Sequence, residues 1–217
     1  MREPNTKGTS LLPLVIGLKN LSNWREIVPA ALHRYFEEPI IVSSWYPERD
    51  YFTLIEALVG AIDPEVAGGD AWRFFGITAA QRDIGGSQDG VHKESRVRSG
   101  LYQSFKTEGP ADIGLFVKRA IMLWEQYHDT GKIVIHGGRR RSNSLVSRLI
   151  GFSIPVDGYL RLQVAYTEEY ARLVGIELKG TVTRSTARGD AFCEWEYAFT
   201  RTPASEAYIA SLTELPW

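Results

Sequence analysis

Apolar residues recur three or four positions apart in several stretches, which is the spacing of one buried helical face. This spacing predicts helices over residues 22–36, 47–62, 65–80, 110–130 and 155–174. Pro29 should bend or divide the first of these helices, because proline removes a backbone hydrogen bond. Gly131 and Gly175 stand where helices commonly end in a left-handed residue.

Beyond Lys132 the apolar period shifts from 3.6 towards 2, which indicates strands. Two predicted hairpins follow, with strands over residues 133–135, 145–152, 176–184 and 191–200. In the last strand Cys193, Trp195, Tyr197 and Phe199 alternate onto one face. The predicted fold is α+β, a single domain with helices packed on one face of an antiparallel sheet built from two C-terminal hairpins.

The predicted boundaries are a disordered N-terminus over residues 1–10 and a single ligand-binding-like α+β domain over residues 11–217. The apolar stretch 11–18 is too short to span a bilayer and lacks a cleavage site, so it is predicted as a buried strand or core segment. Residues 85–100 contain four glycines and few apolar side chains, which predicts an exposed loop.

The charges nearly cancel, with 25 Lys and Arg against 26 Asp and Glu. This balance argues against attraction of the whole protein to nucleic acid or to an anionic membrane. Cys193 is the one cysteine, so it forms no internal disulfide and no cysteine-rich zinc site. A reducing compartment, the cytoplasm, is therefore expected, with Cys193 buried on its strand.

Several short motifs carry a family resemblance over roughly residues 40 to 200. They are the Trp-Tyr-Pro that ends at Pro47, a helix ending in Leu-Trp-x-x-Tyr-x-x-x-Gly at Gly131, and the final Gly-Asp-x-x-Cys at Cys193. These motifs resemble an uncharacterised paralogous family expanded in myxobacteria. That family is similar to the superfamily of vinyl-reductase-type and haem-nitric-oxide-binding domains. The resemblance implies a sensor, a small-molecule binding module or an adaptor more readily than an enzyme.

The departures from that superfamily concern its metal sites. Where zinc-bearing relatives carry a carboxylate and a cysteine, this chain has Val182 and Ser185, so a zinc site is not expected. Haem-binding relatives need an axial histidine and a downstream Tyr-x-Ser-x-Arg. Residues 102–106 are similar, but His92 lies only ten residues earlier in a glycine-rich stretch. We therefore expect no cofactor and no metal.

Other candidate chemistry is sparse. Glu125 and His128 form one Glu-x-x-His on a predicted helix, but di-iron sites need a second copy, so a solvent-facing pair near the helix end is expected. Arg139, Arg140 and Arg141 stand on a predicted hairpin turn. They could bind phosphate or an acidic partner, or form a solvated tip that discourages strand pairing.

Five aromatic residues fall on elements that should face one another, and they are the candidate lining of an apolar pocket, with core packing as the alternative. They are Tyr102, Trp124, Tyr127, Trp195 and Tyr197. The sequence thus favours a non-catalytic cytoplasmic module that binds a small apolar molecule or a partner protein in signalling. A scaffold with a filled core and an enzyme are the alternatives. A homodimer through the first helices or the sheet edge is consistent with related folds.

Overall fold

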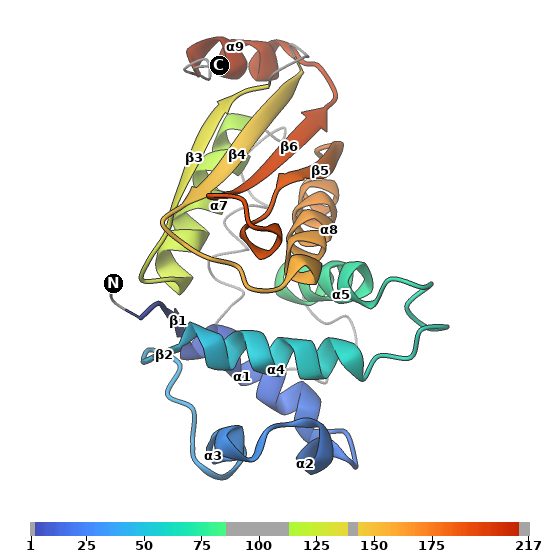
Figure 1. Cartoon of the computed structure of the whole chain (residues 1–217). Helices are drawn as coiled ribbons and strands as arrows, with labels where there is room; N and C mark the ends of the chain where they lie inside the picture. The colour runs from blue at the N-terminus through green and yellow to red at the C-terminus, as the bar shows by residue number, and fades with distance from the viewer. Residues whose placement is uncertain (1–2, 86–112, 139–142, 213–217) are drawn as a thin grey trace. The chain divides into compact units, whose positions relative to one another are not determined.

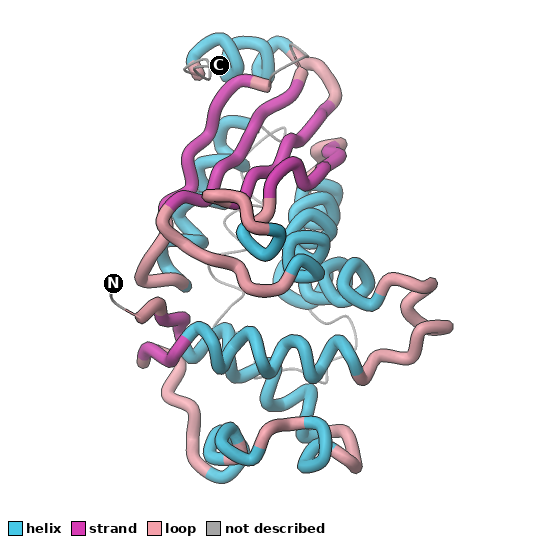
Figure 2. The backbone as a smooth tube through the Cα atoms, in the orientation of Figure 1, coloured by secondary structure: helices cyan, strands magenta, loops and turns pink. Residues whose placement is uncertain are grey.

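The computed structural model describes residues 3–85, 113–138 and 143–212, which form two compact units. Unit 1 comprises the chain up to Ala71 together with Ile121–Lys132, and unit 2 comprises Trp72–Ala120 and the chain from Ile133 onwards. Figure 2 shows helices and strands in a mixture, as the predicted α+β class requires. The expectation of a single domain over residues 11–217 stays a prediction.

Unit 1 begins with a short strand, so the prediction of a disordered N-terminus is wrong for residues 5–10. Strand β1 (Asn5–Lys7) pairs antiparallel with β2 (Trp45–Pro47), and helix α1 (Gly8–Lys19) follows at once. Thr6 is fully buried, and its hydroxyl donates to the Tyr127 carbonyl at 3.1 Å. Long-range bonds of this kind order a terminus whose polar composition alone suggests fraying.

The apolar stretch 11–18 lies inside α1 and is therefore a core helix rather than a strand. Leu11, Leu14 and Leu18 are spaced three and four apart and are at most 3% exposed, so the expected burial is confirmed. A short apolar run fits a buried strand and a buried helix equally well, because periodicity alone does not separate them.

The rest of unit 1 follows the predicted pattern closely. Residues 22–36 are divided at Pro29 into α2 (Trp24–Ile27), a 3-10 turn (Ala30–Leu32) and α3 (Arg34–Glu37). Helix α4 (Glu48–Gly60) follows Pro47 and buries Leu54, Ile55 and Val59. It packs against α1 in the interior of this unit.

In unit 2, helix α5 (Ala71–Gly85) begins later than the predicted 65. Gly68 and Gly69 have φ angles of 60° and 85°, a left-handed backbone that interrupts a right-handed helix. Helix α8 (Asp157–Leu173) lies close to α5, since a Cβ on Gly76 would stand 2.4 Å from the Leu162 carbonyl oxygen.

The second sheet has four strands, all in the C-terminal half of the chain. They are β3 (Lys132–Gly137), β4 (Ser144–Ile150), β5 (Leu178–Arg184) and β6 (Cys193–Phe199). Their spatial order is β3-β4-β6-β5, so an antiparallel β4–β6 pair joins the two predicted hairpins. Figure 1 shows α8 and the first turns of α7 (Ile113–Tyr127) on the same side of this sheet.

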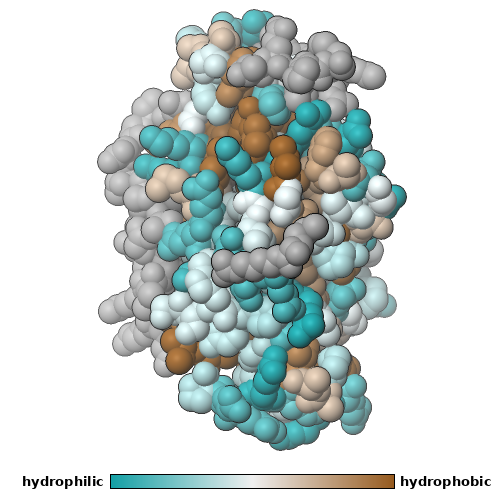
Figure 3. All heavy atoms as spheres, turned by 60° about the vertical axis from the view of Figure 1, so that its left-hand side comes forward, coloured by the Kyte–Doolittle hydropathy of each residue, from teal (hydrophilic) through white to brown (hydrophobic). Residues whose placement is uncertain are grey.

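The sheet face towards the helices is apolar, as predicted. Cys193, Trp195, Tyr197 and Phe199 are each at most 7% exposed. Gly180 on β5 allows a close approach, because a Cβ there would stand 2.8 Å from the Val164 side chain of α8. Figure 3 also shows hydrophobic side chains reaching the surface of unit 2 beside the sheet, where β3 carries half-buried Ile133, Val134 and Ile135.

A last helix, α9 (Pro203–Ser211), was not predicted. Its sequence has no apolar stripe, but Thr202 and Ser205 form a reciprocal capping box at its start, and Pro203 stands at its first position. Within residues 3–85, 113–138 and 143–212, no helix has both the length and the apolar character that a membrane crossing requires.

Candidate functional site

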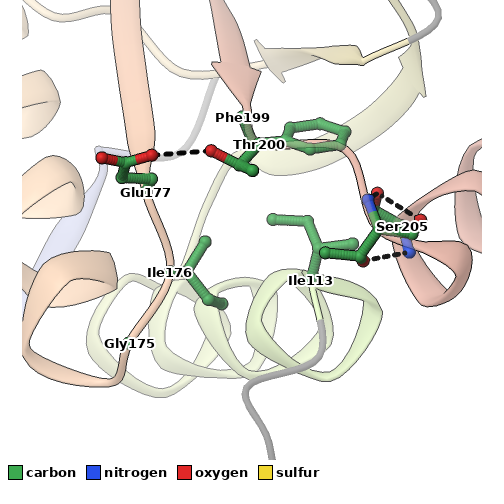
Figure 4. Close-up of a pocket in the computed structure, with 8 residues that line it drawn as sticks. Ile113, Gly175, Ile176, Glu177, Phe199, Thr200 and Ser205 are labelled. Carbon is green, nitrogen blue, oxygen red and sulfur yellow. Dashed lines mark hydrogen bonds between the residues drawn. The ribbon is translucent and has the colours of Figure 1, made fainter.

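A pocket of about 270 Å³ opens on unit 2 where the first turn of α7, the end of β6 and the start of α9 come together (Figure 4). It is lined by Ile113, Gly175, Ile176, Glu177, Phe199, Thr200, Thr202 and Ser205. The volume is just below the roughly 300 to 1,000 Å³ of typical small-molecule sites. The pocket therefore suits a small ligand rather than a large cofactor.

The apolar surface of the pocket comes from three different elements. Ile113 is the first residue of α7 and is 4% exposed, while Phe199 ends β6 and is 5% exposed. In Figure 4 the Ile113 and Ile176 side chains point into the same space below the Phe199 ring. Together these side chains form an apolar wall.

The turn that presents Ile176 depends on Gly175. This glycine has a φ of 86°, and its N–H donates to the Arg172 carbonyl at 3.1 Å, which ends α8 as the sequence predicted. The Ile176 N–H then donates to the Ala171 carbonyl at 2.8 Å. The chain is thereby turned so that Ile176 and Glu177 follow the helix end directly into the pocket wall.

Among the residues of the polar rim that the structure describes, Glu177 is the one charged side chain. Its Oε2 accepts a hydrogen bond of 2.7 Å from the Thr200 hydroxyl, and this pair spans one wall of the pocket (Figure 4). Ser205 lies on the opposite wall, where its hydroxyl donates to the Thr202 carbonyl and accepts from the Thr202 N–H. The Ser205 hydroxyl is therefore occupied by helix capping.

None of the four predicted pocket aromatics that the structure describes lines this cavity. Trp195 and Tyr197 are buried on β6 in unit 2, and burial raises the pKa of Tyr197 well above its usual range. Trp124 and Tyr127 belong to unit 1, whereas Tyr102 lies outside the described residues. A pocket shared by these aromatics stays a prediction, although Phe199 of the observed cavity belongs to the same face of β6.

The three predicted contact arginines, Arg139, Arg140 and Arg141, also lie outside the described residues. Their neighbour Arg148 is placed on β4, where its Nε donates at 2.6 Å to Glu194, a fully buried carboxylate. The Arg148 guanidinium also stands 4.9 Å from the centre of the Phe192 ring. Arg148 therefore neutralises a buried charge and is not a free surface cation.

Glu125 and His128 do not form the solvent-facing pair that the sequence predicted. Glu125 is exposed, but the His128 side chain is only 9% exposed and stacks on Trp124 with ring centroids 3.8 Å apart. His128 Nδ1 stands 3.2 Å from the buried Glu48 carboxylate at the start of α4. The histidine is thus part of the interior of unit 1, because folding brings α4 and β1 to the end of α7.

The Gly-Asp-x-x-Cys motif closes the turn between β5 and β6. Gly189 has a φ of 91°, and the Asp190 carboxylate accepts the Ser185 N–H at 2.7 Å. Cys193 is fully buried, as predicted, with its sulfur 3.3 Å from the Thr186 hydroxyl. Among the described residues no three His, Cys, Asp or Glu side chains gather to hold a metal ion. In this turn the motif is structural.

No protein-family model matches the sequence, and no curated protein matches it either. Solved structures do match the fold. A mutant H-NOX domain of T. tengcongensis is 10% identical, with a TM-score of 0.50, and the match covers 91% of this chain and 99% of that chain. A Cs H-NOX mutant with an unnatural amino acid is 10% identical, covering 91% and 98%, with a TM-score of 0.51. At this identity the likeness shows the fold alone.

In fold, the chain is similar to the haem-nitric-oxide-binding domains named in the resemblance, and no comparison supports the myxobacterial or vinyl-reductase part of it. Haem does not fit the described pocket. The described residues of the lining include no His, Cys, Met or Tyr as an axial ligand and no Arg or Lys for the propionates. The described His33 bonds the Val28 carbonyl, and His128 faces Glu48. His92 lies outside the described residues.

Proposed function

We propose that this chain is a non-catalytic binding module that takes a small, largely apolar ligand into the pocket of unit 2, as a sensor domain in signalling. The apolar wall of Ile113, Ile176 and Phe199, open to solvent at its rim, is the observation that carries the proposal. A preformed concave apolar surface with a few polar groups is the usual form of a ligand site.

Two further observations support this proposal. The fold is shared with H-NOX domains, and one such neighbour at a TM-score of 0.50 comes from work on heme distortion in that family. The hydroxyls of Thr202 and Ser205 are engaged in capping α9, so they serve the structure and not a reaction. The proposal concerns binding, with the ligand held by the pocket itself rather than by a prosthetic group.

The pocket can be filled by substitution. Ile176→Trp should occupy the cavity, and Ile16→Trp is the control, because Ile16 is an apolar side chain of unit 1 that is already 48% exposed. Both variants and the unchanged protein are titrated with small apolar probes while backbone amide NMR shifts are recorded. We expect shifts at residues 175–177 and 199–202 in the unchanged protein and the control, and none in Ile176→Trp. Equal shifts in all three proteins would refute the proposal.

A second candidate function is association with a partner protein, including another copy of this chain. Ile41, Val42 and Trp45 are 60%, 40% and 40% exposed, and Trp45 begins β2, which pairs with β1 on one side. No other described strand pairs with β2. Clustered exposed apolar side chains beside a free strand edge are typical of contact surfaces.

This candidate is tested by sedimentation of the purified protein over a range of concentrations. Association through this surface predicts a dimer that dissociates in Trp45→Glu and persists in Glu56→Gln, a substitution at an exposed site of α4. A protein that stays monomeric at every concentration would remove the self-association form of the proposal.

A further inference from the structure

The polar groups that the pocket rim leaves available to a ligand are hydrogen-bond acceptors rather than donors. Glu177 is the one charged residue among the described residues of the lining, and it makes no ion pair with any of them. Its Oε2 accepts the proton of the Thr200 hydroxyl, so Oε1 and the Thr200 oxygen are left as acceptors. The Ser205 hydroxyl both donates to and accepts from Thr202. The rim therefore offers acceptors to a ligand and needs donors in return.

The partial charges of the helix ends around the pocket do not change the preference of the rim for a ligand that donates hydrogen bonds. Helix α8 ends beside Gly175 with a partial negative charge, and α7 begins at Ile113 with a partial positive charge, each of about half an electron. These two ends offset one another. The start of α9 is already served by the Thr202 cap and by Glu206, which pairs with Arg201. Among the described residues of the rim, Glu177 therefore carries the largest charge.

We propose that the pocket selects small aliphatic primary amines. The alkyl chain lies against Ile113, Ile176 and Phe199, and the ammonium group donates to the Glu177 carboxylate and to the Thr200 oxygen. An ammonium supplies three donors and no acceptor, which matches the acceptors of the rim. A carboxylate of the same length places two acceptors and a like charge at Glu177. This inference rests on the proposed ligand-binding function and adds the chemical class of the ligand.

The test uses three probes of equal chain length: hexylamine, hexan-1-ol and hexanoate. Each is titrated into the full chain at neutral pH while amide NMR shifts of residues 175–177 and 199–202 are followed. We expect hexylamine to bind about fivefold more tightly than hexan-1-ol, the upper range for an ion pair at an exposed carboxylate. Hexanoate should bind more weakly than the alcohol.

Two variants assign the preference to the rim. Glu177→Gln keeps the shape and should lower the affinity for hexylamine until the ratio of the hexylamine and hexan-1-ol affinities is close to one. Glu56→Gln removes an exposed acid of unit 1 and should change neither value. Circular dichroism checks that both variants fold. Because Glu177 is exposed, its amide replacement leaves no buried charge unpaired.

The outcomes separate this inference from the proposed function. Equal binding of the amine and the alcohol to the unchanged protein overturns amine selection but leaves an apolar site. Amine binding that survives in Glu177→Gln at full strength overturns the role of the carboxylate. If none of the three probes shifts the pocket amides, both the amine inference and the apolar-ligand proposal fail.

Discussion

The close crossing of α5 and α8 makes Gly76 the position where one methyl group should have the largest effect. A Cβ at this residue would stand 2.4 Å from the Leu162 carbonyl oxygen and 3.1 Å from both the Ala165 Cβ and the Tyr166 nitrogen. Two of these three atoms are backbone atoms, which do not rotate aside. Gly76→Ala therefore requires the two helices to move apart by most of an ångström or more.

The magnitude follows from two opposing terms. Overpacking a tight contact costs up to about 3 kcal/mol, whereas replacing glycine by alanine inside a helix returns about 1 kcal/mol. The free energy of unfolding should therefore fall by about 2 kcal/mol. For a chain of 217 residues this corresponds to a decrease in Tm of about 4 to 8 °C.

Gly60, the last residue of α4, supplies the matched control. A Cβ there would have no neighbour within 4 Å, so Gly60→Ala should raise the free energy of unfolding by about 0.5 to 1 kcal/mol. Urea unfolding followed by circular dichroism measures both variants. Opposite signs are expected. A Gly76→Ala protein as stable as the unchanged chain would show that α5 and α8 do not approach closely.

Three further predictions concern single groups. Removing the His128 imidazole with His128→Leu should lower the free energy of unfolding by about 3 kcal/mol in urea titrations, because the buried Glu48 carboxylate loses its polar neighbour. The loss should be smaller when Glu48→Gln is also present, because a neutral amide costs less to leave buried. Burial, aided by a 2.6 Å hydrogen bond to Asp50, raises the pKa of Tyr35 to about 12. Since the folded protein favours the neutral phenol, this contribution is complete below about pH 10 and is lost as the pH rises through about 12. In Tyr35→Phe, the free energy of unfolding measured over that pH range should fall less steeply as the pH rises. Thr202→Ala should cost about 1 kcal/mol of α9 stability in hydrogen-exchange measurements, whereas Thr202→Ser should cost little.

The sequence predicted those helices and strands whose apolar side chains recur at a regular period. Helix α4 after Pro47, helix α7 and the two hairpins were predicted because their buried faces recur at the helical or the strand period. Helix α1 was ambiguous because its apolar run is short, and β1 and β2 were missed. Those two strands have three residues each, and they are defined by partners 38 to 42 positions apart or by the distant Asp129.

The candidate pocket was only partly accessible from sequence. Ile113 and Phe199 were identified as buried residues of their elements, but their meeting depends on the β4–β6 pairing and on the start of α9. Thr202, Pro203 and Ser205 carry a capping pattern that could have revealed α9. Glu177 follows a predicted helix end, and nothing local in the chain indicates that Thr200 would hold its carboxylate.

The buried thiol of Cys193, next to the β5–β6 turn, can report how often the structure around it opens transiently. Cys193 is the sole cysteine of the chain and is shielded from solvent, so an alkylating reagent reaches the sulfur only when the strand and its turn open transiently. The labelling rate at rising reagent concentration thus measures how often this corner of the sheet opens. Because Cys193 and Phe199 share β6, occupancy of the pocket should slow that chemistry without any introduced probe.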